Sequence, residues 1–88
     1  MQTQKKKSIG KVTECSKGIE GKYANYFEIG HNAFEFVLDF GQYYPGTEKA
    51  ELCTRIITCP EYAKAFLATL LESIREYEEQ FKKIKNGD

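Results

Sequence analysis

The sequence lacks the long apolar run and the apolar leader that direct a chain into a membrane. No stretch approaches the ~20 apolar residues of a transmembrane helix, and the N-terminus is rich in Gln and Lys without a signal-peptide core. An excess of one charge is also missing, because 13 basic residues balance 13 acidic ones. This balance argues against a duplex nucleic-acid binder, and we expect a cytoplasmic protein with no membrane partner.

Cysteine is scarce and histidine nearly absent. Cys15, Cys53 and Cys59 form no CxxC pair, and their odd number leaves at least one thiol unpaired in any disulfide scheme, which favours a reducing compartment. A Gly-rich phosphate loop, a GxSxG elbow, an HExxH motif and a Ser/His/Asp set are all missing. We therefore expect no cofactor and no enzymatic activity.

The length allows one small domain. A chain of 88 residues buries only about 60–65% of its unfolded surface, so proteins of this size often add a disulfide, a metal or a partner subunit. Residues 1–21 hold three glycines and scattered aliphatics, which predicts a flexible basic N-terminal tail. A short edge strand around 9–15 and weak polyanion contact through Lys5, Lys6 and Lys7 remain open alternatives. Residues 22–88 are predicted to form a single βββα domain.

Alternating apolar residues predict two strands around the only histidine. The first apolar set is odd-numbered (Tyr23, Phe27, Ile29) and the second even-numbered (Phe34, Phe36, Leu38, Phe40). In an antiparallel pair, both sets lie on the same face of the sheet only if the numbers of two directly paired residues add up to an odd number. We predict the pairs Gly30 with Ala33, Ile29 with Phe34, Phe27 with Phe36, and Tyr23 with Phe40. His31 and Asn32 then form a two-residue turn.

A third strand is predicted in "AELCTRIIT". The register that sets Leu38 beside Ile56, Val37 beside Ile57 and Asp39 beside Arg55 matches apolar with apolar residues and acid with base. The loop before it, Pro45 to Lys49, has a strong Pro-Gly turn signal.

The residues after this strand have apolar side chains spaced by three and four positions, as on one face of a helix. They are Ala63, Phe66, Leu67, Leu70, Ile74, Tyr77, Phe81 and Ile84. Pro60 and Glu61 suit the first turn, with Thr58 or Cys59 as N-cap, and Asn86-Gly87 suits the end. A helix of ~24 residues spans ~36 Å and should overhang strands of ~27 Å.

The predicted fold is α+β: a three-stranded antiparallel β-meander followed by one long C-terminal α-helix packed on the Phe34/Phe36/Leu38/Phe40 face. One helix cannot cover both sheet faces, and its last turns overhang. The apolar residues left without cover are candidates for an oligomer interface: Tyr26, Val37, Ile57, Tyr77, Phe81 and Ile84. They indicate a homo-oligomer, most simply a two-fold dimer.

Three weak candidates for chemistry compete with purely structural roles. The predicted register places Glu28 opposite Glu35, close to His31, where a cation could relieve the repulsion. The ordinary alternative is that His31 only forms the turn. A zinc site from Cys53, Cys59 and His31 lacks the tight ligand pairs of structural zinc. Cys59, at a helix N-terminus, could have a lowered thiol pKa, but no histidine is known to lie near it.

The most specific segments are the Gly-His turn, "EFVLDFG", and the junction from "TRI" through "PE" and "AK" into the helix. Through them, the chain resembles the small bacterial and archaeal proteins termed domain of unknown function 3467, over roughly Tyr23 to Ile84. That family commonly has a serine before Pro-Glu and a glycine after the late Phe, where this chain has Cys59 and Lys82. Thr58 can replace the serine as N-cap, and Lys82 suggests a helix that runs on toward Asn86. The resemblance implies no activity.

We therefore expect a non-enzymatic, oligomeric protein-interaction module. A chaperone-like binder of apolar segments is one alternative, since the sheet is rich in aromatic residues. A single-stranded nucleic-acid binding protein is another, because aromatic side chains can stack on bases. Acidic residues near those aromatics weaken the second alternative.

Overall fold

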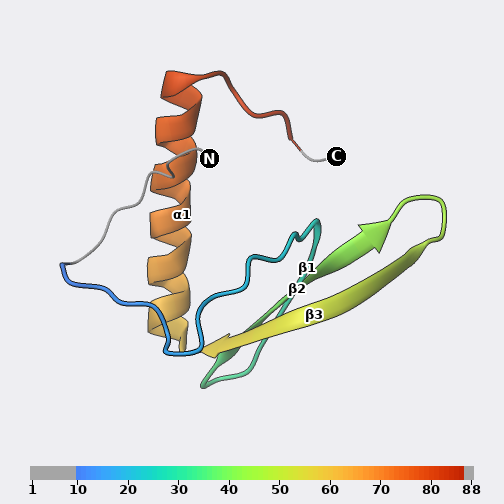
Figure 1. Cartoon of the computed structure of the whole chain (residues 1–88), viewed down its shortest axis with the longest axis horizontal. Helices are drawn as coiled ribbons and strands as arrows, with labels where there is room; N and C mark the ends of the chain where they lie inside the picture. The colour runs from blue at the N-terminus through green and yellow to red at the C-terminus, as the bar shows by residue number, and fades with distance from the viewer. Residues whose placement is uncertain (1–9, 87–88) are drawn as a thin grey trace.

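The computed structural model describes residues 10–86 and contains three strands followed by one helix. The elements are β1 (Tyr26–His31), β2 (Phe36–Tyr44), β3 (Lys49–Thr58) and α1 (Pro60–Gln80). The strands form one antiparallel sheet in the order β1-β2-β3, and α1 rises from the end of β3 (Figure 1). This is the predicted α+β meander followed by a helix.

The N-terminal segment that the structure describes, residues 10–25, contains no strand. The edge strand considered around 9–15 is therefore not found in its described part. Lys5, Lys6 and Lys7 lie outside the described residues.

The register between β2 and β3 is the predicted one. Leu38 pairs with Ile56, Val37 with Ile57 and Asp39 with Arg55. The turn that joins the strands covers residues 45–48, and Gly46 in it has a φ of +89°. One feature was not predicted: the register shifts by one between Phe40 and Gly41, so that Cys53 is the extra residue of a β-bulge.

The predicted register between β1 and β2 is wrong, although its parity is right. Phe27 pairs with Phe40 and Ile29 with Leu38, and His31 pairs with Phe36 at the end of the ladder. His31 is therefore a strand residue, and residues 32–35 form the turn. Phe34, expected on the buried face, lies in this turn with 84% of its surface exposed.

The side chain of Asn32 explains why the longer turn forms. Its Oδ1 accepts hydrogen bonds from the backbone N–H groups of Phe34 (2.8 Å) and Glu35 (2.9 Å). The Asn32 N–H in turn donates to the Glu35 carbonyl (3.0 Å). Asn is a preferred residue for such side-chain to backbone turns, and this arrangement leaves Glu35 outside the ladder.

We expect Asn32→Ala to lower the free energy of unfolding by about 1–2 kcal/mol, because two backbone donors lose their acceptor. Asn32→Asp keeps that oxygen and should cost much less. Urea unfolding followed by circular dichroism compares the two variants. Equal losses would show that the side-chain oxygen does not hold the turn.

Helix α1 begins as predicted and ends earlier than predicted. Cys59 is the N-cap residue, without a side-chain cap, and Pro60 occupies the first turn. The expected continuation toward Asn86 is wrong, because the backbone leaves the helix at Phe81. The Glu78 carboxylate there accepts the N–H of Ile84 (2.9 Å), so a side chain replaces the helical acceptor.

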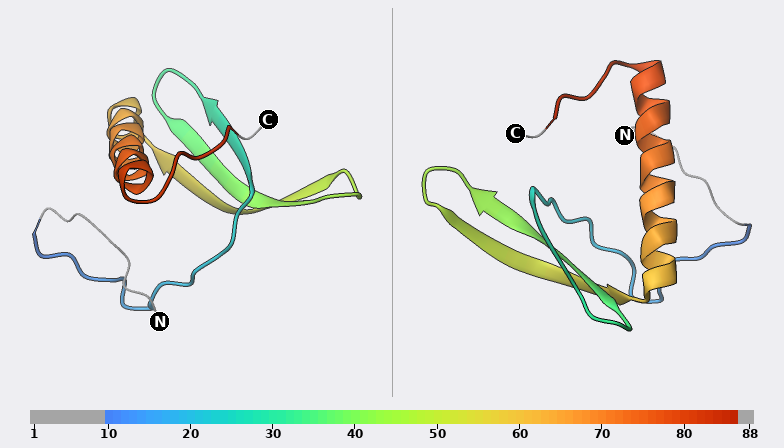
Figure 2. Two further views of the ribbon diagram at one scale, coloured as in Figure 1. Left: turned by 90° about the horizontal axis from the view of Figure 1, so that it is seen from above. Right: turned by 180° about the vertical axis from the view of Figure 1, so that it is seen from behind.

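The fold of the single chain is open. Among the described residues, Leu38 is the one buried hydrophobic side chain, and no residue of α1 is buried. The radius of gyration is 15.5 Å, whereas a compact chain of this length has about 12 Å. Figure 2 shows why: α1 stands at an angle to the sheet and diverges from it beyond its first turns.

Exposed surface gives a second measure of this openness. An unfolded chain of 10.1 kDa exposes about 14,600 Å² and a compact folded one about 5,300 Å². This chain exposes 8766 Å². A single copy thus removes about 40% of its unfolded surface from water, instead of the usual 60–65% or so.

Candidate functional site

An apolar groove with a volume of about 570 Å³ lies between α1 and the sheet. We call it the helix–sheet groove. The sheet contributes Ile29, Phe36 and Leu38, and the helix contributes Pro60, Ala63, Lys64, Phe66, Leu67 and Leu70. The volume is that of a ligand pocket, but the lining has almost no polar group to orient a small molecule. Such a lining suits an apolar side-chain surface instead.

The residues of the groove come from regular alternation on both elements. Ile29 and Leu38 are cross-strand neighbours, and their side chains share the sheet face that looks toward α1, which we call the inner face. The helix contributes an apolar stripe spaced by three and four positions. This apolar stripe consists of Ala63, Phe66, Leu67, Leu70, Ile74, Tyr77 and Phe81.

The apolar stripe divides into two halves at the edge of the groove. Its first four residues line the groove, whereas Ile74, Tyr77 and Phe81 lie beyond it. The rings of Tyr77 and Phe81 pack on each other with centroids 4.9 Å apart. The predicted overhang is therefore present, and it is apolar.

The weak metal candidates Glu28, His31 and Glu35 do not come together. Side chains alternate between faces along a strand, so Glu28 and His31 lie on opposite faces of β1, and Glu35 lies in the turn. The expected pairing of Glu28 with Glu35 is wrong, because the register pairs Glu28 with Asp39. Within residues 10–86, no group of three or more His, Cys, Asp or Glu side chains is placed to hold a metal ion.

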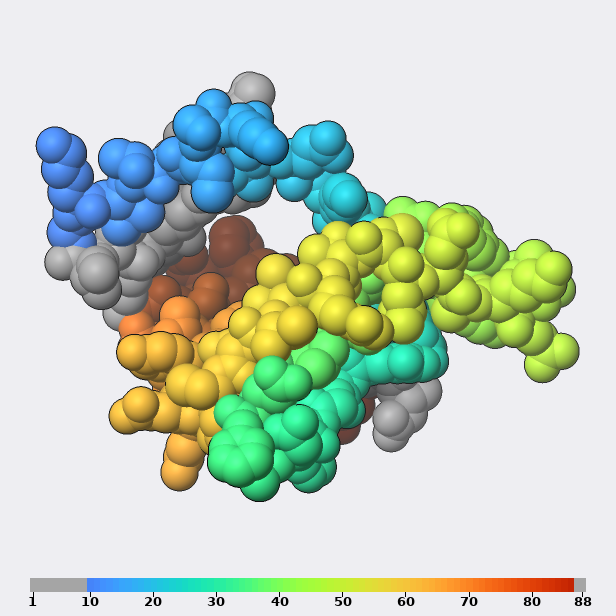
Figure 3. Space-filling view, turned by 90° about the horizontal axis from the view of Figure 1, so that it is seen from below, coloured from blue at the N-terminus to red at the C-terminus, as the bar shows by residue number. Residues whose placement is uncertain are grey.

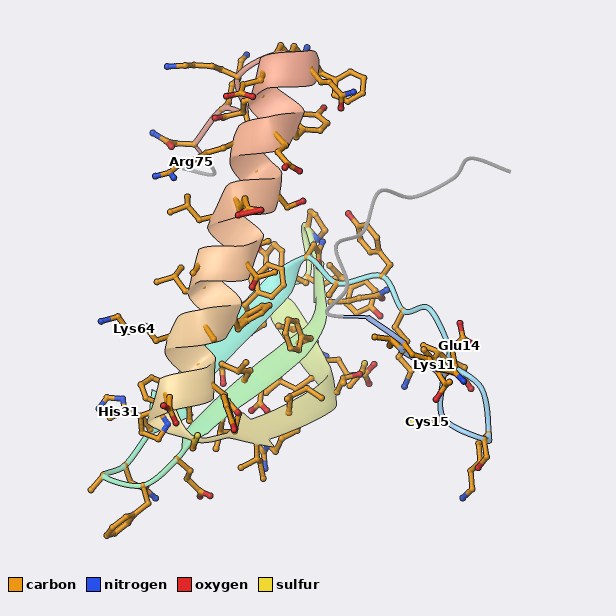
Figure 4. All side chains as sticks on the ribbon, turned by 90° about the vertical axis from the view of Figure 1, so that its left-hand side faces the viewer. Lys11, Glu14, Cys15, His31, Lys64 and Arg75 are labelled. Atoms are coloured by element: carbon orange, nitrogen blue, oxygen red, sulfur yellow. The ribbon has the colours of Figure 1, made fainter. Side chains whose placement is uncertain are left out.

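His31 belongs to the aromatic end of the inner face. Its ring stacks on Phe36 with centroids 5.4 Å apart. Figure 4 shows His31 and Lys64 near the first turns of α1, with Arg75 farther along the helix. His31 thus packs on Phe36, which itself lines the groove.

The sheet face that points away from α1, the outer face, carries a polar row across all three strands. Glu28 pairs with Asp39, and Asp39 with Arg55. Asp39 is only 7% exposed, and Arg55 binds it in a fork, Nε to Oδ1 at 2.8 Å and Nη2 to Oδ2 at 2.9 Å. Tyr26 donates its hydroxyl to Glu28 (2.7 Å). The two neighbouring carboxylates are thus each stabilised by a separate donor.

This row shifts the pKa values of Tyr26, Asp39 and Arg55. The hydrogen bonds from Arg55 lower the pKa of Asp39, against an opposing effect of burial. The hydrogen bond and the negative charge of Glu28 raise the pKa of Tyr26. Each pKa shift arises from a single neighbouring side chain. This is typical of a hydrogen-bonded ion-pair network that stabilises the fold, not of a catalytic pair.

Stability should fall on acidification through Asp39. A folded-state pKa below the unfolded value of ~3.9 means that the ion pair contributes fully above that pH and is lost as the pH falls through the lowered pKa. In urea unfolding, wild type should therefore exceed Asp39→Asn at pH 6 by more than at pH 2.5. A difference that does not change with pH would contradict this role of Asp39.

The three cysteines are separate free thiols. Cys15 and Cys53 are exposed, and Cys59 is half-buried between β3 and α1. Cys53 lies at the bulge, away from the helix junction at Cys59, so the considered zinc set is not assembled. Figure 4 places Cys15 with Lys11 and Glu14 on the N-terminal segment.

The predicted interface residues lie on three different surfaces. Tyr26, Val37 and Ile57 are on the outer face, which α1 leaves uncovered (Figure 3). Tyr77 and Phe81 belong to the apolar stripe, and Ile84 lies in the segment after α1. The 3–4 spacing placed Phe66, Leu67 and Leu70 in a closed core, so their exposure at the surface was not predicted. In the described part of the chain, no helix is long and apolar enough to cross a membrane.

These features define a small α+β protein whose helix and meander enclose an open apolar groove. The chain belongs to the family described as "Protein of unknown function (DUF3467)", which matches residues 1–86. This confirms the resemblance seen in the sequence, and the description assigns no activity. Searches among curated proteins and among solved structures gave no match.

Proposed function

We propose that this protein is a non-enzymatic interaction module that works as a homo-oligomer, most simply a dimer. The observation that carries the proposal is the helix–sheet groove, whose apolar lining comes from both the sheet, with Leu38, and the helix, with Leu67. Leu67 is 61% exposed in the single chain. Burying surface of this kind is the main favourable term in protein association.

The surplus of exposed surface supports the same proposal. A chain that removes only about 40% of its unfolded surface gains little to offset its conformational entropy. A second subunit supplies the missing burial, as it does in many small proteins. The three free thiols support a reducing, cytoplasmic location for this assembly.

Light scattering after size-exclusion chromatography tests the proposal. We expect a mass of about twice the 10.1 kDa chain, and a melting temperature that rises with protein concentration. A mass of one chain at every concentration, with a constant melting temperature, would contradict the proposal.

A chaperone-like role is the second candidate, because an open apolar groove can accept an extended apolar segment. The two roles differ in concentration dependence. A chaperone-like monomer suppresses aggregation of an unfolded client in proportion to its concentration, whereas a dimer whose groove is filled does not.

A further inference from the structure

We propose that the helix–sheet groove is filled by α1 of a second copy of this chain, running antiparallel to the first. The C-terminal half of each helix then lies on the inner sheet face of the other copy. This inference rests on the proposed function, because it names the occupant of the same groove.

The chain's own helix cannot close the groove. Only Cys59 separates β3 from α1, and its backbone is extended, with φ −89° and ψ 164°. The following Pro60 has a fixed φ and disfavours a helical conformation at Cys59. The helix therefore leaves the sheet at an angle set by this one-residue junction, and the groove stays open in the single chain.

The two halves of the apolar stripe complement each other head to tail. The half that lines the groove ends at Leu70, and the half beyond the groove begins at Ile74. When the second helix runs antiparallel, its distal half, which is the part of its apolar stripe from Ile74 to Phe81, lies beside the groove of the first copy. The facing pairs, each from one copy to the other, are then Ala63 with Phe81, Leu67 with Tyr77, and Leu70 with Ile74. All three pairs are apolar, the small Ala63 faces the large Phe81, and a two-fold axis repeats every contact.

Charge favours the antiparallel direction. Lys64 lies on the rim of the groove, and Glu78 lies on the same flank of the helix near its other end. An antiparallel pair brings Lys64 of one copy toward Glu78 of the other, and it also opposes the two helix dipoles. A parallel pair would place the two Lys64 side chains at the same level on opposite sides of the interface, far from either Glu78.

The area available is sufficient. A stable dimer buries about 800 Å² on each partner. The chain exposes 8766 Å², roughly 3,500 Å² more than a compact chain of its mass. Part of that surplus belongs to the extended N-terminal segment, and the remainder includes the groove and the distal half of the apolar stripe. Phe81, at the end of the stripe, is 67% exposed in the single chain.

Site-directed cross-linking tests the pairing. In a background with Cys15→Ser, Cys53→Ser and Cys59→Ser, we place two thiols with Leu67→Cys and Tyr77→Cys. Ten residues along one helix span about 15 Å, so a bis-maleimide matched to the 8–10 Å between packed helices joins different chains. We expect covalent dimers from the double variant and few from either single variant. Ala63→Cys with Phe81→Cys provides a second pair, and circular dichroism checks that each variant folds.

The result separates this inference from the proposed function. Efficient cross-linking of the single variants would show a parallel pair and overturn the inference. A dimeric mass without cross-linking in either double variant would overturn it as well, while the proposed function stands. A monomeric mass for the unmodified chain would overturn both.

Discussion

Leu70→Asp is expected to leave the protein monomeric at concentrations at which the wild type is a dimer. Leu70 lies in the helix–sheet groove and is 46% exposed in the single chain. Each copy would lose the burial of a leucine, about 1.5–3 kcal/mol, and would have to bury a carboxylate. Counted over two copies, the dissociation constant should rise on the order of 10³-fold or more.

Ala68→Asp is the matched control, because it adds the same charge to the same helix. Ala68 is exposed and lies outside the groove lining, on the side of α1 away from the apolar stripe. Sedimentation equilibrium should show a dimer for Ala68→Asp and a monomer for Leu70→Asp. Equal effects of the two substitutions would exclude the stripe as the interface.

Gly41→Ala is expected to destabilise the sheet by about 3 kcal/mol or more, beyond the usual cost of overpacking. Gly41 is buried at the β-bulge. An added Cβ would overlap the carbonyl oxygen of Glu51 and lie 2.8 Å from its carbonyl carbon and 2.9 Å from the Cα of Leu52. All three atoms belong to the backbone of β3, so no side-chain rotation relieves the contact.

For a domain of this size, the loss corresponds to a fall of roughly 12–24 °C in melting temperature. Gly30→Ala makes the same change on β1, where an added Cβ meets nothing within 4 Å. It should therefore leave the melting temperature nearly unchanged or slightly raised. Differential scanning calorimetry of both variants measures the contrast, and a Gly41→Ala protein as stable as Gly30→Ala would contradict the close approach of the strands.

Sequence patterns were sufficient to predict the β2–β3 pair because two independent matches agree on it. The alignment of Leu38 with Ile56 satisfies burial, and that of Asp39 with Arg55 satisfies charge. For β1 and β2, the prediction combined parity with the tolerance of His31 and Asn32 for a tight two-residue turn, and an odd sum is compatible with several registers. The choice among them depends on the two hydrogen bonds of Asn32, which favour the longer turn.

The bulge and the end of α1 were not predictable in the same way. Gly41 and Cys53 become distinctive only when two strands approach closely. The backbone leaves the helix at Phe81, where Glu78 accepts the N–H of Ile84, and no single-residue propensity contains that contact.

The sequence predicted which apolar residues belong to the groove, but not that they form an open groove. The 3–4 spacing identified Phe66, Leu67 and Leu70 as apolar, and the overhang of Tyr77 and Phe81 followed from helix length. The angle of α1 depends on the conformation of Cys59. Since that angle decides whether apolar residues form a closed core or an open groove, periodicity alone assigned them to a core.

The most direct test of the central claim, that a second copy covers the apolar stripe, is hydroxyl-radical footprinting read by mass spectrometry. Phe81 in the stripe and Phe34 in the β1–β2 turn have the same chemistry, and they are 67% and 84% exposed in the single chain. At concentrations well above the dissociation constant, Phe81 should be oxidised several-fold more slowly than Phe34, and Leu70→Asp should reduce the difference to the ratio of these two exposures. Oxidation of both residues in proportion to these exposures in the wild-type protein would contradict the account.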